Sequence, residues 1–136
     1  MVENIRERFN MKTKFYICKK SGIVFHRCVD KDETTLCNDN QFIELLPNTV
    51  DASKEKHLPV VSINSDSVTV SIGSITHPMD SNHYISFIYL ETENSGQIKY
   101  LNPGNNPIVT FHIKDDKPIA VYEYCTLHGL WKTNIS

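Results

Sequence analysis

Short apolar runs separated by turn-forming residues constrain the fold of this chain more than any other feature. From residue 41 onward these runs are rich in β-branched and aromatic residues, and clusters of Asn, Asp, Gly, Pro, Lys and Ser separate most of them. The runs are Phe42–Leu46, Leu58–Ile63, Val68–Ile72, Tyr84–Thr92, Gln97–Leu101, Ile108–Ile113 and Ile119–Tyr124. In the third run Val68, Val70 and Ile72 alternate with polar residues and are expected to face the core. With no competing helical pattern, the chain is predicted to be all-β, a seven-stranded antiparallel β-sandwich.

The N-terminal part of the chain has a different character. Residues 1–13 are polar and strongly charged, and they are expected to form a tail. The stretch from Lys14 to about Asn40 holds three of the four cysteines and shows little regular periodicity. We therefore predict a tail and small segment over residues 1–40, followed by the β-sandwich over residues 41–136.

Charge and composition exclude several classes of function. The formal net charge is −2, the pI is near 6.3, and Lys and Arg are scattered, so nucleic acid is not an expected partner. No apolar run is long enough to span a membrane, and the charged N-terminus does not resemble a signal peptide. A cytoplasmic protein is expected, in which the cysteines are thiols or metal ligands rather than disulfides.

Strand direction gathers five potential metal ligands at one end of the predicted sandwich. If consecutive strands run antiparallel, the end where the 58–63 strand begins is also the end where the 68–72 and 119–124 strands finish. The residues next to these termini that could bind a metal are His57, His77, His83, Cys125 and His128. Cys125 and His128 form a Cys-x2-His pair that a single turn can direct at one ion. The same reasoning places His112 at the opposite end and excludes it.

The number and type of these donors discriminate between metals. Structural zinc usually takes four protein ligands and catalytic zinc three, fewer than the five available here. Four imidazoles and one thiolate suit iron, and would leave its sixth position open to a small molecule. A blue-copper electron carrier is the alternative, although no Met follows His128 and the remaining histidines would be unused. A sandwich that binds partners without a metal is a third hypothesis.

A set of motifs extends from about residue 41 to Lys132: Glu44-Leu-Leu-Pro-Asn-Thr, Glu55-Lys-His57-Leu-Pro59, His77-Pro-Met79, His83-Tyr84 and Tyr122-Glu-Tyr-Cys125-Thr-Leu-His128-Gly-Leu-Trp131. Together they resemble the superoxide reductase family, which includes desulfoferrodoxins and neelaredoxins. The resemblance implies an immunoglobulin-like sandwich that reduces superoxide to hydrogen peroxide. It also implies one mononuclear iron, with axial Cys125 and four equatorial histidines: His57, His77, His83 and His128.

Two residues that precede His57 are candidates for roles in the reaction. Lys56 would add positive charge near the open position and attract the superoxide anion. Glu55 resembles the residue that becomes the sixth ligand of oxidised iron in the family. Either residue could instead be an ordinary charged surface residue. An external one-electron donor such as a rubredoxin is the expected partner, and a homo-oligomer, dimer or tetramer, is the expected assembly.

The N-terminal segment departs from the longer family members, which carry a second, rubredoxin-like iron on four cysteines. Cys18-Lys-Lys-Ser21 resembles their Cys-x2-Cys motif with its second cysteine replaced. Cys37-Asn38 resembles their adjacent cysteine pair with one member lost. Two thiolates are too few for a tetrathiolate site. We therefore expect one iron per chain, with Cys18, Cys28 and Cys37 as thiols that bind no metal.

Overall fold

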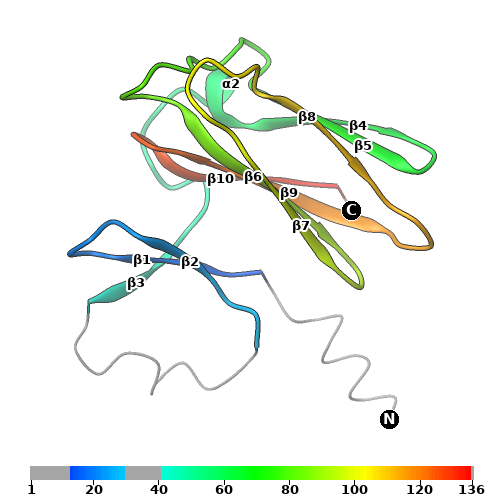
Figure 1. The fold of residues 1–136 in the computed structure, drawn as a ribbon, viewed down its shortest axis with the longest axis horizontal. Coiled ribbons are helices and arrows are strands. Elements are labelled where there is room, and N and C mark those ends of the chain that lie inside the picture. The colour runs from blue at the N-terminus through cyan, green and yellow to red at the C-terminus, as the bar shows by residue number, and fades with distance from the viewer. Residues whose placement is uncertain (1–12, 30–40, 136) are drawn as a thin grey trace. The chain divides into compact units, whose positions relative to one another are not determined.

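The computed structural model describes residues 13–29 and 41–135, and the chain forms two compact units, Met1–Leu46 and Pro47–Ser136. Both units are built from antiparallel strands (Figure 1).

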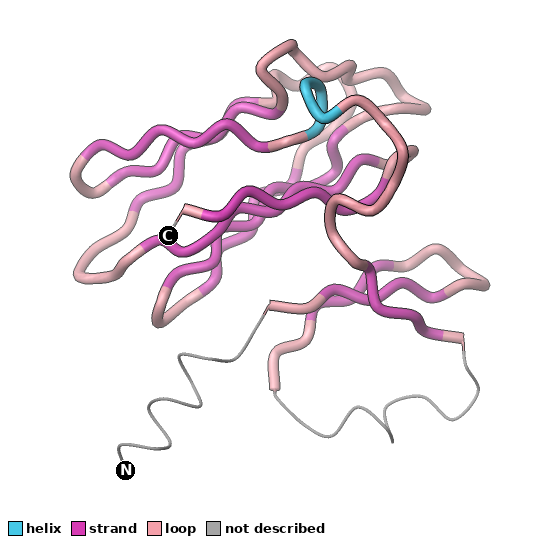
Figure 2. Tube along the Cα trace, turned by 180° about the vertical axis from the view of Figure 1, so that it is seen from behind, coloured by secondary structure: helices cyan, strands magenta, loops and turns pink. Residues whose placement is uncertain are grey.

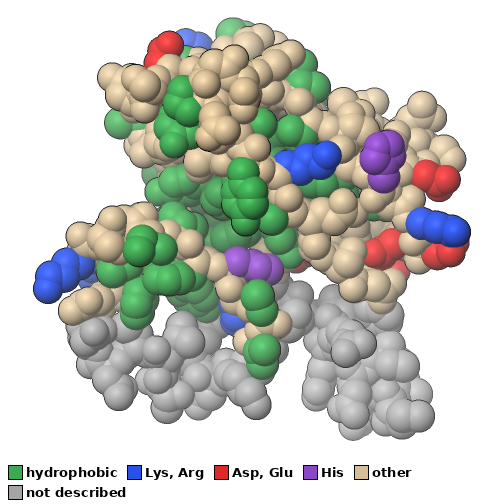
Figure 3. Space-filling model, in the orientation of Figure 1, with side chains coloured by type: hydrophobic (Ala, Val, Ile, Leu, Met, Phe, Trp, Pro, Cys, Tyr) green, Lys and Arg blue, Asp and Glu red, His purple; other side chains and the backbone are tan. Residues whose placement is uncertain are grey.

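On the face drawn in Figure 3, acidic and basic side chains lie interspersed and do not gather into one basic patch. Among the described residues, no helix has the length and apolar character that a membrane crossing requires.

The N-terminal unit contains a small three-stranded sheet in the order β2-β1-β3. Its strands are β1 (Phe15–Cys18), β2 (Val24–His26) and β3 (Phe42–Leu45). Every residue of β3 pairs with β1, from Cys18 opposite Phe42 to Phe15 opposite Leu45. The prediction that this segment is a strand is confirmed, but its assignment to the sandwich is wrong. Apolar character predicts that a strand forms, whereas its pairing partner depends on residues distant in the sequence.

The C-terminal unit is a sandwich of two antiparallel sheets (Figures 1 and 2). One sheet has the order β4-β5-β8, from β4 (Pro59–Asn64), β5 (Ser67–Ile72) and β8 (Ile108–His112). The other has the order β10-β9-β6-β7, from β6 (Ile85–Thr92), β7 (Gly96–Tyr100), β9 (Pro118–Cys125) and β10 (Gly129–Asn134). The all-β antiparallel sandwich is confirmed over the described residues. Its seventh strand is β10, which follows His128 and was not predicted.

The core lies between the two sheets. Val68, Val70 and Ile72 of β5 are buried as their alternation predicts, and they pack in one apolar cluster with Ile88 and Leu90 of β6. At about 25 cal/mol per Å² of apolar surface, burial of each such side chain stabilises the fold by roughly 1.5–3 kcal/mol. The core therefore provides a rigid support for the loops at the ends of the strands.

A single helical turn, α2 (Lys54–His57), precedes β4 among the loops at one end of the sandwich (Figure 2). One turn is too short to produce a 3.6-residue pattern, so the sequence did not reveal it. Gly73 permits its position, because Gly73 has φ +81° and an added Cβ would lie 2.8 Å from the Glu55 carbonyl and 2.7 Å from that of Lys56. The Ile75 N–H donates to the Glu55 carbonyl at 3.1 Å. The loop after β5 is thereby held against α2.

Candidate metal centre

Strand pairing places the predicted ligands at one end of the sandwich. Pro59 at the start of β4 lies opposite Ile72 at the end of β5, and Ile85 at the start of β6 lies opposite Cys125 at the end of β9. His112 pairs with Ser67, at the other end of β5. The antiparallel argument from the sequence is therefore confirmed for the strands, and His112 lies at the opposite end as that argument predicts.

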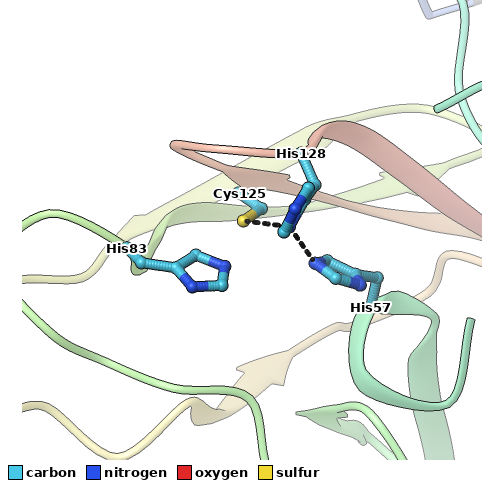
Figure 4. Close-up of side chains that lie close together, drawn as sticks. All are labelled: His57, His83, Cys125 and His128. Carbon is cyan, nitrogen blue, oxygen red and sulfur yellow. Dashed lines mark hydrogen bonds between the residues drawn. The ribbon is translucent and has the colours of Figure 1, made fainter. Parts of the chain in front are cut away.

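Four of the predicted side chains point toward a common space (Figure 4). One nitrogen or sulfur atom from each lies within 4.8 Å of the others, and the residues are His57, His83, Cys125 and His128. They come from α2, from the residues before β6, from the end of β9 and from the turn before β10. The cluster thus joins segments separated by up to 71 residues.

His77 lies beside these four. Its ring centroid is 4.7 Å from that of His57 and 4.8 Å from that of His83, with interplanar angles of 76° and 81°. The Nε2 atoms of His77 and His83 are buried and have no hydrogen-bond partner among the described residues. An unsatisfied buried nitrogen is costly unless something outside the protein binds it. All five predicted residues are therefore brought together, and two of them present nitrogens that lack a protein partner.

Backbone carbonyls select the tautomers of two histidines. His57 Nδ1 lies 2.6 Å from the Ser53 carbonyl, and His77 Nδ1 lies 2.6 Å from the Pro78 carbonyl. Because a carbonyl can only accept, each Nδ1 carries the proton and donates it, which leaves Nε2 unprotonated, with a lone pair that can accept a hydrogen bond or bind a metal. His57 Nε2 lies 3.0 Å from His128 Nδ1. The lone pairs needed for metal binding are therefore already oriented by the backbone.

The surroundings keep these imidazoles neutral. Burial lowers the pKa of His77 to about 4, although its hydrogen bond to Pro78 opposes the fall. Burial also lowers the pKa of His57 and of His83, and positive charge on His128 and Lys56 lowers both further. Only the neutral imidazole binds a metal. His57, His77 and His83 are thus ready to bind a cation at neutral pH.

The turn between β9 and β10 surrounds the sulfur of Cys125. The thiol is fully buried, and burial raises its pKa, while N–H groups of Leu127 and His128 directed at the sulfur oppose the rise. Gly129 closes the turn with φ +80°, a conformation that glycine adopts without strain. A bound cation would displace the thiol proton, because the thiolate is the form that binds metals.

Two further links hold the His83 segment against this turn. The Thr126 N–H donates to the Tyr84 carbonyl at 3.0 Å, and the Tyr84 N–H donates to Thr126 Oγ1 at 3.1 Å. His83 and Asp80 form an isolated antiparallel bridge, with backbone hydrogen bonds of 3.0 and 3.1 Å. Although His83 belongs to a loop, its backbone is therefore fixed on both sides.

The residues present fit a metal ion. Four imidazoles and one thiol meet at one end of the core, and the backbone directs at least two of the nitrogens inward. Imidazoles suit iron, copper, nickel and zinc, and a thiolate increases the preference for a redox metal.

Glu55 and Lys56 lie on α2, directly before His57, and both side chains are exposed. Lys56 is the neighbour of His57 on this turn, and its charge contributes to lowering the pKa of His57 and of His83. Lys56 forms no ion pair within residues 13–29 and 41–135. Its charge is consequently available to an anion that approaches the cluster.

The sequence reasoning assigned no role to two buried residues beside the cluster, although both belong to the last of its motifs. Trp131 is 1% exposed and stacks on the His57 ring. Glu123 is fully buried, lies opposite Trp131 in the β9–β10 pairing, and has no partner for either carboxylate oxygen among the described residues. Burial raises the pKa of Glu123 well above its usual value. Glu123 lies two residues from Cys125 and so shares its face of β9. Strand alternation could therefore have predicted from the sequence that Glu123 faces inward with Cys125.

The cysteines of the N-terminal unit are placed only in part. Cys18 is buried in β1, whereas Cys28 is exposed with its sulfur 3.9 Å from His26 Nδ1. Cys37 lies outside the described residues. Within residues 13–29 and 41–46, no three metal-ligating side chains gather. Whether these cysteines bind no metal stays a prediction.

Comparisons with known proteins identify the family. Residues 49–134 match the family model described as Desulfoferrodoxin. The chain belongs to the desulfoferrodoxin family. A desulfoferrodoxin of Syntrophotalea carbinolica is 35% identical over 122 residues, which cover 90% of this chain and 96% of the relative. A protein of Pyrococcus horikoshii named superoxide reductase is 31% identical over 99 residues, which cover 60% of this chain and 86% of the relative. The resemblance inferred from the motifs is confirmed.

Solved structures agree with this family. The superoxide reductase of Treponema pallidum matches with a TM-score of 0.76 and 33% identity, over 91% of this chain and 100% of that protein. A superoxide reductase of Giardia intestinalis described as 1Fe-SOR matches with a TM-score of 0.54 and 28% identity, over 61% of this chain and 99% of that protein. The match to the Treponema pallidum protein therefore includes residues of the N-terminal unit as well as the sandwich.

Proposed function

We propose that this protein is a superoxide reductase. The reaction consumes one superoxide, one electron and two protons and yields one hydrogen peroxide. The observation that carries the proposal is the convergence of His57, His83, Cys125 and His128 within 4.8 Å, with His77 alongside, at one end of a desulfoferrodoxin sandwich.

The five residues would hold one iron per chain. When bound, this iron supplies the electron that superoxide accepts. The two kinds of ligand contribute differently. The histidines would bind the iron as neutral imidazoles, whereas Cys125 would give up its proton and bind as an anionic thiolate. With ferrous iron the ligands would leave a formal charge of +1, which favours an anionic substrate although the chain carries −2 overall.

Lys56 would draw superoxide toward this end of the sandwich. Its side chain is exposed on the helical turn that ends at His57, and its charge contributes to lowering the pKa of His57 and His83. In solution such a charge acts over a Debye length of about 8–10 Å. It can also order water that delivers protons. Glu55, its neighbour on α2, would supply a carboxylate to the sixth position in the oxidised resting state.

The electron would come from an external one-electron donor such as a rubredoxin. Ser21 and Asn38 stand where a rubredoxin-like site would need cysteines, so the chain has no complete set of thiolates to relay electrons internally. The family resemblance is also the basis for proposing a homo-oligomer, either dimer or tetramer.

The test combines metal analysis with product stoichiometry. The purified protein is expected to contain one iron per chain, and its oxidised form should show a thiolate-to-ferric absorption band. With a reductant present, pulse radiolysis should yield one hydrogen peroxide per superoxide consumed, whereas dismutation would yield half as much. Copper in place of iron, with no reaction toward superoxide, would instead support an electron carrier of the blue-copper type. Protein without any bound metal would favour a binding module.

A further inference from the structure

Trp131, the single tryptophan of the chain, contacts two of the proposed ligands in two different ways. Its ring lies on the face of the His57 imidazole, with centroids 4.9 Å apart and planes inclined by 22°. Its Nε1–H donates to the His128 carbonyl at 3.2 Å. Trp131 is only 1% exposed and stands three residues after His128 on β10. One buried side chain therefore links two ligands that are 71 residues apart in the sequence.

The stack restrains a motion of His57 that its hydrogen bond leaves free. Ser53 holds the imidazole at Nδ1, which fixes one atom of the ring but leaves it able to tilt about that contact. The neighbouring rings of His77 and His128 meet His57 edge to face, at 76° and 88°. The His83 ring is also near-parallel to that of His57, at 28°, but its centroid is 6.5 Å away, whereas that of Trp131 is 4.9 Å away. Trp131 is therefore the closer ring on a face of His57, and its packing opposes the tilt that would turn Nε2 away from the cluster.

The hydrogen bond restrains His128 through its backbone. The Cys125–Gly129 turn positions the His128 side chain, and the indole N–H binds the carbonyl at the end of that turn. His57 Nε2 and His128 Nδ1 then lie 3.0 Å apart, close enough to share one cation. Since both ends of this distance depend on Trp131, the indole controls how well the two nitrogens are prepared for metal binding.

We propose that Trp131 is a positioning residue that sets the affinity of this centre for a divalent metal by fixing His57 and His128 relative to each other. The proposal rests on the proposed metal centre. Residues that orient metal ligands typically contribute about 10- to 100-fold to metal affinity. The contacts of Trp131 with the cluster are the His57 ring and the His128 carbonyl, so its effect is on the spacing of the ligand nitrogens.

The experiment measures the affinity of the metal-free, full-length protein for Co²⁺ by competition with a chelator, followed by cobalt absorption. Trp131→Leu removes both the stacked face and the N–H donor, and is expected to weaken Co²⁺ binding about 10- to 100-fold. Trp131→Phe keeps an aromatic face and should lie between wild type and Trp131→Leu. Both variants should retain the thiolate-to-cobalt band because Cys125 is unchanged.

Phe111→Leu is the matched control. Phe111 is also a fully buried aromatic residue of the core, but it pairs with Val68 near the opposite end of the sandwich. This variant should lower the thermal midpoint yet bind Co²⁺ within about twofold of wild type. The same loss of affinity in Phe111→Leu and Trp131→Leu would reduce Trp131 to a general packing residue and overturn the proposal.

Folded Trp131→Leu that binds Co²⁺ as tightly as wild type would also overturn it. If Trp131→Leu does not fold, the comparison of Trp131→Phe with wild type decides, and equal affinity counts against the role. Wild-type protein that binds no Co²⁺ would refute the metal centre itself. That outcome is distinct from a wild-type centre that binds the metal and is indifferent to Trp131.

Discussion

The two ends of the sandwich each gather polar side chains, but they differ in how these side chains are satisfied. At the end opposite the histidines, the Asp116 carboxylate accepts hydrogen bonds from Thr92 Oγ1 at 2.6 Å, Ser95 Oγ at 3.1 Å and the backbone N–H of Lys117 at 2.8 Å. Asn94 adds two more, at 3.2 and 3.3 Å. At the histidine end, buried Nε2 atoms of His77 and His83 have no partner within the described part of the chain.

The difference indicates that the Asp116 network has a structural role and that the histidine cluster has a functional one. A carboxylate with a full set of donors has nothing left to offer a ligand, and the Asp116 network joins the β6–β7 hairpin to the loop before β9. Nitrogens that are buried without donors or acceptors cost stability, and a bound cation removes that cost. Hydrogen-bond satisfaction therefore distinguishes the two ends better than the number of polar residues does.

The largest expected effect comes from removing the sulfur. Cys125→Ser should lose the thiolate-to-iron band and abolish superoxide reductase activity, because Cys125 is the one thiol in the described cluster. His112→Ala, which alters an exposed histidine at the opposite end, is the control and should remain close to wild type. Iron content, the visible spectrum and superoxide decay give the comparison. Equal losses in both variants would refute the assignment of the functional end.

The two ends should also respond to acid in different pH windows. His77 has a pKa lowered from 6.5 to about 4, so it adds stability above pH 6.5 that is lost as the pH falls toward 4. A shift of this size corresponds to at most roughly 3 kcal/mol. Burial alone would raise the pKa of Asp116, but its hydrogen bonds hold that pKa below 3.8, and its contribution is lost only below that value.

Thermal unfolding of the metal-free protein from pH 7 to pH 3 tests this difference. The midpoint should fall between pH 6.5 and 4, and His77→Leu should flatten the fall, because its uncharged side chain does not titrate. Asp116→Asn should leave this window unchanged. A slope between pH 6.5 and 4 that is the same in wild type and His77→Leu would contradict the assigned cause.

A smaller effect is expected when the satisfied cluster is broken. Asp116→Ala should lower the free energy of unfolding by about 1–3 kcal/mol, since it removes the carboxylate that accepts from Thr92, Ser95 and Lys117, although buried Thr92 keeps the Ser95 carbonyl as an acceptor. The affinity for Co²⁺ should stay within about twofold of wild type. Denaturant unfolding and cobalt titration of the same preparation provide both values. A large loss of metal affinity would show that the two ends are coupled rather than independent.

The smallest effects concern the exposed residues of α2. Lys56→Ala should slow the reaction of the reduced enzyme with superoxide a few-fold, and its rate should depend less on ionic strength than that of wild type. Glu55→Ala should leave that rate nearly unchanged and alter the spectrum of the oxidised resting form. Pulse radiolysis at several salt concentrations measures the first effect. If Lys56→Ala reacts at the wild-type rate with the same salt dependence, Lys56 is an ordinary surface lysine with no part in attracting superoxide.

Local pattern was enough to predict most of the strands and the grouping of the ligands. Alternation identified the buried face of β5, and antiparallel pairing carried His57, His77, His83 and the Cys125–His128 turn to the same end. These inferences succeed because strand period and strand direction are properties of short stretches of chain. The motifs between residues 41 and 132 then indicated the family.

Tertiary structure decided what depends on contacts between distant residues. Phe42–Leu45 and Gly129–Asn134 are both short strands, and only pairing placed the first with β1 and the second with β9. The stack of Trp131 on His57 and the burial of Glu123 likewise join segments that no local pattern connects. Strand periodicity shows which residues of a strand face the core, but packing in three dimensions decides which neighbours they contact there.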